Sequence, residues 1–253
     1  MRIPFAFFSL ALAACSDAEE GFSWGPVAYG ANPPDARAAA ATLPPRGDGG
    51  CADVVVVEHA EARYAAWWEA GEDGGSVLML ARSPDGGATW EAPIVADDRD
   101  AGGLRCSRPP PSLFSDETSE YLHVSYHISP PGSPGVYFTH SMKASVLGTS
   151  GEGVLHMPVP VTHGERPVLS SVAGRGDTVV VAFEDPNSAR PRILLAYSTG
   201  AGHVFEAPRA VSPAGAAATV PRVTLTADSV RVQWMEALPD GSFRAASRSA
   251  RLP

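Results

Sequence analysis

The sequence predicts an all-β fold made of four similar sheets, each with four antiparallel strands. The chain has 253 residues, among them 25 Gly and 24 Pro, and about 238 residues follow a predicted N-terminal leader, enough for one all-β domain with a sizeable core. Short apolar segments separated by polar turns recur along this length. An aromatic residue recurs in the second strand of each unit, at spacings of 58, 57 and 51 residues: Trp68, Tyr126, Phe183 and Trp234. A period of this length is typical of repeated sheets.

The same order of strands is expected in every unit. The first strands are Val54–Val57, Pro109–Phe114, Pro167–Ala173 and Pro221–Thr226. The second strands are Tyr64–Glu69, Leu122–His127, Val179–Glu184 and Val230–Glu236. The third strands are Val77–Ser83, Val136–Ser141, Ile193–Ser198 and Phe243–Ser249. Fourth strands are visible in three units, at Trp90–Ala96, Leu155–Thr162 and Phe205–Ser212.

The fourth strand of the last unit is expected at the N-terminus. Residues Phe22–Tyr29 resemble Ala88–Val95, whose strand completes the first unit. Pairing of this segment with the C-terminal hairpin would close a ring of sheets and remove exposed strand edges. The fold class is therefore a β-propeller of four-stranded antiparallel blades, four in number and closed by an N-terminal strand. A shallow sandwich of irregular strands, or a ring of five blades, is the alternative.

One turn carries a specific motif, Ser83-Pro84-Asp85-Gly86-Gly87-Ala88-Thr89-Trp90. The Asp85 carboxylate can accept backbone N–H bonds across the turn, and the two glycines allow positive φ. Thr89 and Trp90 then open the next strand. The pattern of Ser83, Asp85, Gly87, Thr89 and Trp90 resembles the Asp-box, or BNR repeat, of sialidase-like β-propellers. An ordinary hairpin is the alternative. The third unit resembles a decayed copy that lacks the Asp, from Tyr197 to Pro208.

Residues 1–15 are typical of an export signal. Arg2 precedes a run of apolar residues that ends in Leu12-Ala13-Ala14-Cys15, which resembles a bacterial lipobox. The resemblance implies that Cys15 is lipidated and anchors the protein at the bacterial cell envelope, on its periplasmic or extracellular side. An ordinary cleaved secretory signal is the alternative. Residues 16–253 then form a single domain, in which residues 31–50 are a loop or linker rich in Ala, Pro and Gly.

The two other cysteines, Cys51 and Cys106, are expected to form a disulfide, because the chain is predicted to reach an oxidising compartment. Two unpaired buried thiols are the alternative. The net charge is -9, and Lys143 is the only lysine, so nucleic acid is excluded as a partner. A ring closed by its own strand needs no second subunit, which predicts a monomer.

Loops between second and third strands, together with the connections between units, are expected on one face. An acid follows the aromatic residue in three units, at Glu69, Glu184 and Glu236, and His127 takes this place in the other. An arginine stands at the entry to three first strands, at Arg108, Arg166 and Arg222. The resemblance implies that these arginines clamp a carboxylate, as the arginine triad of sialidases does. Arg–Glu pairs that only bridge neighbouring sheets are the alternative.

The predicted function is a non-catalytic module that binds a glycan or an envelope protein. The alternative is a sialidase-like exo-glycosidase acting on sialylated or other acidic glycans, with Glu184 and Glu236 as candidate acid and base. No tyrosine falls on a predicted first strand, where the family's nucleophile would be needed. No cofactor is expected. The run Asp97-Asp98-Arg99-Asp100 offers oxygen ligands for Ca²⁺ but lacks the spacing of a calcium loop, and the seven histidines show no zinc motif.

Overall fold

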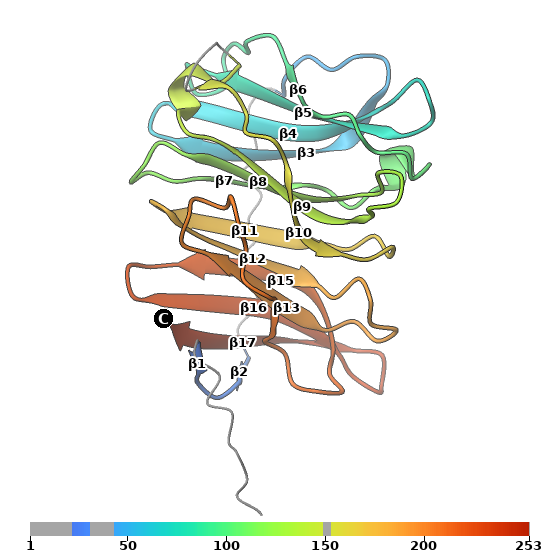
Figure 1. Ribbon diagram of the computed structural model, residues 1–253, viewed down its shortest axis with the longest axis vertical. Helices are drawn as coiled ribbons and strands as arrows, with labels where there is room; N and C mark the ends of the chain where they lie inside the picture. Colours follow the sequence, from blue (N-terminus) through green and yellow to red (C-terminus); the bar gives the residue numbers. More distant parts are fainter. Residues whose placement is uncertain (1–21, 31–42, 149–152, 253) are drawn as a thin grey trace, which may run out of the picture.

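The computed structural model describes residues 22–30, 43–148 and 153–252. It is all-β, with four antiparallel sheets that follow one another in chain order (Figure 1). The predicted propeller of four-stranded antiparallel blades is confirmed. The predicted signal and Cys15 lie outside the described residues, as does most of the 31–50 segment.

Each sheet runs from an inner first strand to an outer fourth strand. The first sheet contains β3 (Gly50–His59), β4 (Ala62–Ala70), β5 (Ser76–Ser83) and β6 (Ile94–Asp97). The second contains β7 (Ser112–Ser115), β8 (Leu122–Ile128), β9 (Gly135–Ser141) and β10 (Val159–His163). The third contains β11 (Ser170–Arg175), β12 (Thr178–Glu184), β13 (Ile193–Ser198) and β14 (Arg209–Ala210). The fourth contains β15 (Ala217–Leu225), β16 (Ser229–Ala237) and β17 (Phe243–Arg251). Two short 3₁₀ turns complete the elements, η1 (Arg105–Ser107) and η2 (Ala144–Val146).

The N-terminal segment completes the fourth sheet, as predicted. It forms two short strands, β1 (Ser23–Trp24) and β2 (Ala28–Tyr29), and both pair antiparallel with β17. Residues 22–30 therefore lie beside the C-terminal strand, β17 (Figure 1). Without this segment, β17 would present an unpaired edge.

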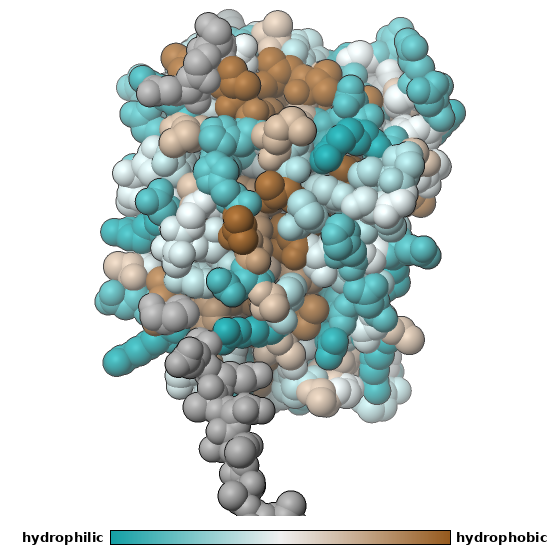
Figure 2. Space-filling view, viewed as in Figure 1, coloured by the Kyte–Doolittle hydropathy of each residue, from teal (hydrophilic) through white to brown (hydrophobic). Residues whose placement is uncertain are grey.

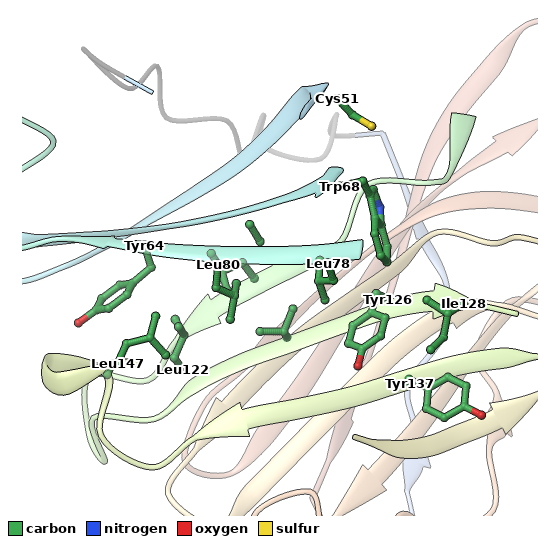
Figure 3. Packing of buried hydrophobic residues seen from close by; sticks show 14 residues of the cluster. Cys51, Tyr64, Trp68, Leu78, Leu80, Leu122, Tyr126, Ile128, Tyr137 and Leu147 are labelled. Carbon is green, nitrogen blue, oxygen red and sulfur yellow. The ribbon is translucent and has the colours of Figure 1, made fainter. Parts of the chain in front are cut away.

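Consecutive sheets pack through apolar clusters. Between the first and second sheets, the Trp68 and Tyr126 rings meet edge to face with centroids 6.0 Å apart, and Leu78 and Ile128 lie in the same cluster (Figure 3). The Trp68 indole Nε1 donates to the carbonyl oxygen of Pro109 at 2.9 Å, which ties β4 to the chain entering the second sheet. All four recurring aromatic residues are buried. They are the anchors that the repeat predicted.

Serine hydroxyls tie the inner strands to one another. The Ser112 hydroxyl on β7 accepts from the Val172 N–H on β11 at 3.0 Å. The Ser171 hydroxyl on β11 accepts in the same way from the Val223 N–H on β15 at 3.1 Å. Two further apolar clusters join the second sheet to the third and the third to the fourth. Backbone groups that face a neighbouring sheet thus find side-chain partners.

The hydrogen bonds of the turn at residues 83–90 are those that its residues predict, but Thr89 and Trp90 do not open the next strand, because β6 begins at Ile94. The Asp85 carboxylate accepts from the Thr89 N–H at 2.8 Å and from its hydroxyl at 2.7 Å. The Ser83 hydroxyl donates to Asp85 and accepts from the Gly87 N–H, both at 2.8 Å. These bonds lower the pKa of Asp85 to about 2, the Thr89 backbone bond contributing most. Gly87 has φ +94°, which a residue with a Cβ rarely adopts.

The third sheet keeps part of the same turn. The Ser198 hydroxyl accepts from the Gly202 N–H at 3.1 Å, which repeats the bond between Ser83 and Gly87.

The predicted disulfide joins Cys51 on β3 to Cys106 in η1, across 55 residues. Among the described residues, no helix has the length and apolar character needed to cross a membrane. The surface seen in Figure 2 is mostly hydrophilic or neutral, with hydrophobic patches near the first sheet and near the middle of the view.

Candidate functional site

An open hollow of about 740 Å³ lies between the second and third sheets, on the face predicted to bind a ligand. Its walls come from the β8–β9 loop, the connection into the third sheet and the β12–β13 loop. The lining residues are Gly132, Ser133, Pro134, His163, Gly164, Glu165, Arg166, Pro186 and Asn187. Gly164 permits the close approach of the last two segments, because a Cβ there would lie 2.5 Å from Cγ of Pro186.

Arg166 provides the positive charge of the hollow. Its Nη2 donates to the Asp185 carbonyl oxygen, while its Nε is buried and has no hydrogen-bond partner. The Asp185 carboxylate is turned elsewhere, since it accepts from Nε of Arg192 at 2.7 Å and from the Asn187 N–H at 2.9 Å. The Arg166 guanidinium is therefore hydrogen-bonded to the neutral carbonyl group of Asp185 and not to its carboxylate.

Other polar groups around the hollow are linked in a row. Asn187 donates from Nδ2 to the His163 carbonyl oxygen at 2.7 Å. The Ser133 hydroxyl lies 3.4 Å from Nδ1 of His163 and 2.8 Å from the Tyr137 hydroxyl. Tyr137 in turn donates to the Ser133 carbonyl oxygen at 2.7 Å. These contacts fix hydroxyl, amide and imidazole groups at the rim of the hollow.

Arg108 lies in the interior and is paired. Its Nη2 donates to Oδ1 of Asp100 at 2.5 Å, and both side chains are entirely buried. Its Nη1 donates to the His127 carbonyl oxygen at 2.8 Å. Asp100 also accepts from the backbone N–H groups of Ser76 at 3.0 Å and Ser129 at 2.8 Å. Burial lowers the pKa of Arg108, and the Asp100 charge opposes that effect. The pair joins the β4–β5, β8–β9 and inter-sheet loops.

His127 connects this buried pair to the hollow. Its Nε2 lies 3.1 Å from the Gly164 carbonyl oxygen and its Nδ1 lies 3.5 Å from Nη1 of Arg108. Burial, together with the charges of Arg108 and Arg166, lowers the pKa of His127 to about 4, although the Gly164 backbone bond and the Asp100 charge oppose this effect. The ring is neutral near pH 7, so Nε2–H donates to Gly164 and Nδ1 accepts.

The three predicted acids are all engaged with protein donors. Glu69 accepts from Nε1 of Trp67 at 3.0 Å. Glu184 accepts at 3.0 Å from the N–H of Val220, which lies in a bulge of β15. Glu236 pairs with Arg244, with Nη2 and Oε2 2.8 Å apart.

Arg222 donates from Nη1 to the Pro221 carbonyl oxygen at 2.9 Å. The lining of the hollow includes Arg166 but neither Arg108 nor Arg222. The arginines predicted to converge thus have different surroundings. Arg108 pairs with Asp100 in the connection between the first and second sheets.

The acidic run at residues 97–100 is likewise engaged. Asp97 accepts two bonds from the Arg99 guanidinium, at 3.0 and 2.7 Å, and a third from the Tyr126 hydroxyl at 2.7 Å. Asp100 is the partner of Arg108. These two carboxylates hold loops in place through protein donors.

One group of potential ligands escapes the sequence patterns. His140, His156 and His203 each bring a ring nitrogen within 4.8 Å of the others. They lie 16 and 47 residues apart in two different sheets, so no local spacing could reveal them.

No protein-family model matches the chain, and no curated protein is similar to it. Solved structures are similar at low identity. A xylan β-1,4-xylosidase from Bacillus halodurans C-125 is 12% identical with a TM-score of 0.48, covering 82% of this chain and 42% of that one. The catalytic domain of a GH62 α-L-arabinofuranosidase from Coprinopsis cinerea is 12% identical with a TM-score of 0.49, covering 82% and 68%. GH43B of a Bacteroides ovatus xyloglucan PUL is 15% identical with a TM-score of 0.45, covering 82% and 38%. The chain thus spans less than half of the first and third of these proteins.

Proposed function

We propose that this protein is an exported, lipid-anchored, sialidase-like propeller that binds a carboxylate-bearing glycan in the hollow at Arg166 without hydrolysing it. One observation carries the proposal. Arg166 lines the open hollow, and its guanidinium is hydrogen-bonded to the neutral Asp185 carbonyl oxygen. A guanidinium in such a place favours a carboxylate ligand, because the two planar groups can form paired charge-assisted hydrogen bonds.

The remaining walls suit a sugar. Ser133, His163 and Asn187 supply groups that can exchange hydrogen bonds with ring hydroxyls, and their own contacts limit the side-chain freedom that binding would otherwise cost. Ligand sites commonly combine a few fixed polar groups of this kind in a concave surface.

The surroundings of the acids favour binding over hydrolysis. Glycoside hydrolysis needs two carboxyl groups facing one glycosidic bond, one of them able to donate a proton. Glu184, in the third sheet, accepts a hydrogen bond from the Val220 N–H. Glu236, in the fourth sheet, is paired with Arg244 of the same sheet. Neither residue belongs to the lining of the hollow.

Calorimetry with matched oligosaccharides tests the proposal. We expect the purified protein to bind a glycan ending in sialic acid or glucuronic acid at least about tenfold more tightly than its neutral counterpart. Arg166→Ala is expected to weaken that binding about 10- to 100-fold, the range for hydrogen bonds between charged groups. Arg190→Ala, an exposed change in the β12–β13 loop, is the matched control and should bind like the wild type.

A turnover assay addresses the alternative. The wild type should release no fluorophore from a fluorogenic sialoside above background. Turnover that disappears in Arg166→Ala would contradict the non-catalytic proposal and favour the sialidase-like hydrolase instead.

The lipid anchor has its own test. Metabolic labelling with a tritiated fatty acid should mark the wild type in the envelope fraction and leave Cys15→Ser unlabelled. Labelling of Cys15→Ser, or an unlabelled wild type, would contradict the anchor while leaving the ligand proposal intact.

A further inference from the structure

Three histidines meet at the end of the strands far from the hollow. His140 lies on β9, His156 on the segment that precedes β10, and His203 in the β13–β14 turn. β9 begins beside the hollow at Gly135, so His140 lies roughly 17 Å further along the strand. The histidines therefore form a site separate from the one described above, between the second and third sheets.

The main chain fixes where these histidines stand. The His156 N–H donates to the His140 carbonyl oxygen at 2.8 Å, and the Thr139 hydroxyl donates to the His156 carbonyl oxygen at 2.6 Å. In the third sheet, the His203 N–H closes its turn on the Gly200 carbonyl oxygen at 3.0 Å. Backbone bonds thus hold all three Cα positions.

Ring nitrogens of His203 and His156 face each other, and the one on His203 carries a lone pair. Nδ1 of His203 lies 2.7 Å from the Gly200 carbonyl oxygen, which can only accept, so Nδ1 carries the proton and Nε2 the lone pair. That Nε2 lies 3.0 Å from Nδ1 of His156. A histidine whose second nitrogen donates to a backbone carbonyl is oriented as metal-ligating histidines usually are.

The imidazole of His140 has a nitrogen that makes no hydrogen bond. Nε2 of His140 is buried and has no hydrogen-bond partner, and the residue is only 2% exposed. A buried polar atom without a partner is costly, and a ligand is one of the reasons for which such an atom is retained.

We propose that His140, His156 and His203 bind one Zn²⁺ ion between the second and third sheets. Three imidazoles and no carboxylate suit zinc and related transition metals and not Ca²⁺ or Mg²⁺. Tetrahedral ligands at zinc lie ~3.3 Å apart, given Zn–N distances of about 2.0–2.1 Å. The nitrogens here, one pair at 3.0 Å and all within 4.8 Å, lie close to that spacing. His203 is exposed, which leaves the fourth position open to water.

The ion would cross-link two sheets, because His140 and His156 belong to the second sheet and His203 to the third. Binding to the folded chain alone stabilises it by mass action.

Calorimetric titration of ZnCl₂ into untagged, chelator-treated protein tests the site. We expect one ion per chain in the wild type. His203→Ala should lower the affinity at least about 100-fold, since losing a ligand should cost at least as much as losing a second-shell partner. His59→Ala removes a histidine from β3, away from the cluster, and should bind as the wild type does.

Two further readouts keep the test independent of folding. His203 is on the surface, so His203→Ala should melt like the wild type in chelator, while Zn²⁺ should raise the melting temperature of the wild type alone. Co²⁺ should give the visible d–d absorption of a tetrahedral site in the wild type and lose it in His140→Ala. A wild type that binds no Zn²⁺, or His203→Ala that binds it equally well, would overturn the proposal.

Discussion

Arg108 donates to Asp100 across 2.5 Å in a place where neither side chain reaches solvent. A buried ion pair adds little net stability relative to apolar residues, yet each partner depends strongly on the other. The pair also gathers the backbone of Ser76, Ser129 and His127. It therefore specifies how the loops between the first two sheets are arranged beneath the hollow.

Removal of this arginine should be severely destabilising. Arg108→Met leaves the Asp100 carboxylate buried and unpaired, which is expected to lower the free energy of unfolding by about 3–5 kcal/mol. Urea denaturation measures this loss. Arg190→Met, on an exposed loop, should stay within about 0.5 kcal/mol of the wild type. Equal stability of the two variants would show that Arg108 is not held as described.

Glu184 should prove structural. Glu184→Ala leaves the Val220 N–H without its acceptor, in a bulge where Val220 has φ +54°, and should cost about 1–3 kcal/mol. Glu184→Gln keeps an acceptor oxygen and should recover most of that loss in thermal and urea melts. If instead both variants were fully stable and Glu184→Gln altered glycan turnover, a catalytic role would replace the structural one.

The disulfide should supply a substantial part of the stability. Cys51 and Cys106 close a loop across 55 residues, for which the chain-entropy relation gives about 4 kcal/mol. We expect Cys51→Ser/Cys106→Ser to lose stability of this order in urea denaturation. Dithiothreitol should destabilise the wild type by a similar amount and leave the double variant unchanged.

Asp85 should contribute to the acid dependence of stability. Its pKa is about 2 in the folded chain against 3.8 for an ordinary aspartate, so the unfolded state takes up the proton first as the pH falls. The stabilisation is present above about pH 4 and disappears as the pH falls through about 2. Thermal melts of wild type and Asp85→Ala should therefore differ most above pH 4 and converge toward pH 2. A constant difference across that range would argue against the turn bonds as the cause.

The fold was predictable because its signals are local and repeated. The aromatic residues at 68, 126, 183 and 234 mark one strand in each sheet, and the likeness of residues 22–29 to residues 88–95 places the N-terminal segment in the last sheet. The hydrogen bonds of the turn at Ser83 could also be predicted, because they join residues at most four positions apart.

The site was less predictable because it depends on contacts between sheets. The sequence places Arg108 and Arg166 at equivalent entries to β7 and β11, yet one is paired inside with Asp100 and the other lines the hollow. The Asp100 carboxylate is held by the Ser129 N–H, and Gly164 lets its segment approach Pro186 closely. Loop conformations of this kind leave no periodic pattern in the sequence. The histidine cluster is hidden for the same reason, because its members meet only when the second and third sheets pack.

The location of a bound acidic sugar tests the central claim most directly. A crystal structure of the protein with a sialic acid- or glucuronic acid-terminated oligosaccharide should show the carboxylate within hydrogen-bond distance of the Arg166 guanidinium, with hydroxyls near Ser133 and Asn187. A sugar bound at another surface, or a carboxylate in the hollow that makes no contact with Arg166, would contradict the account.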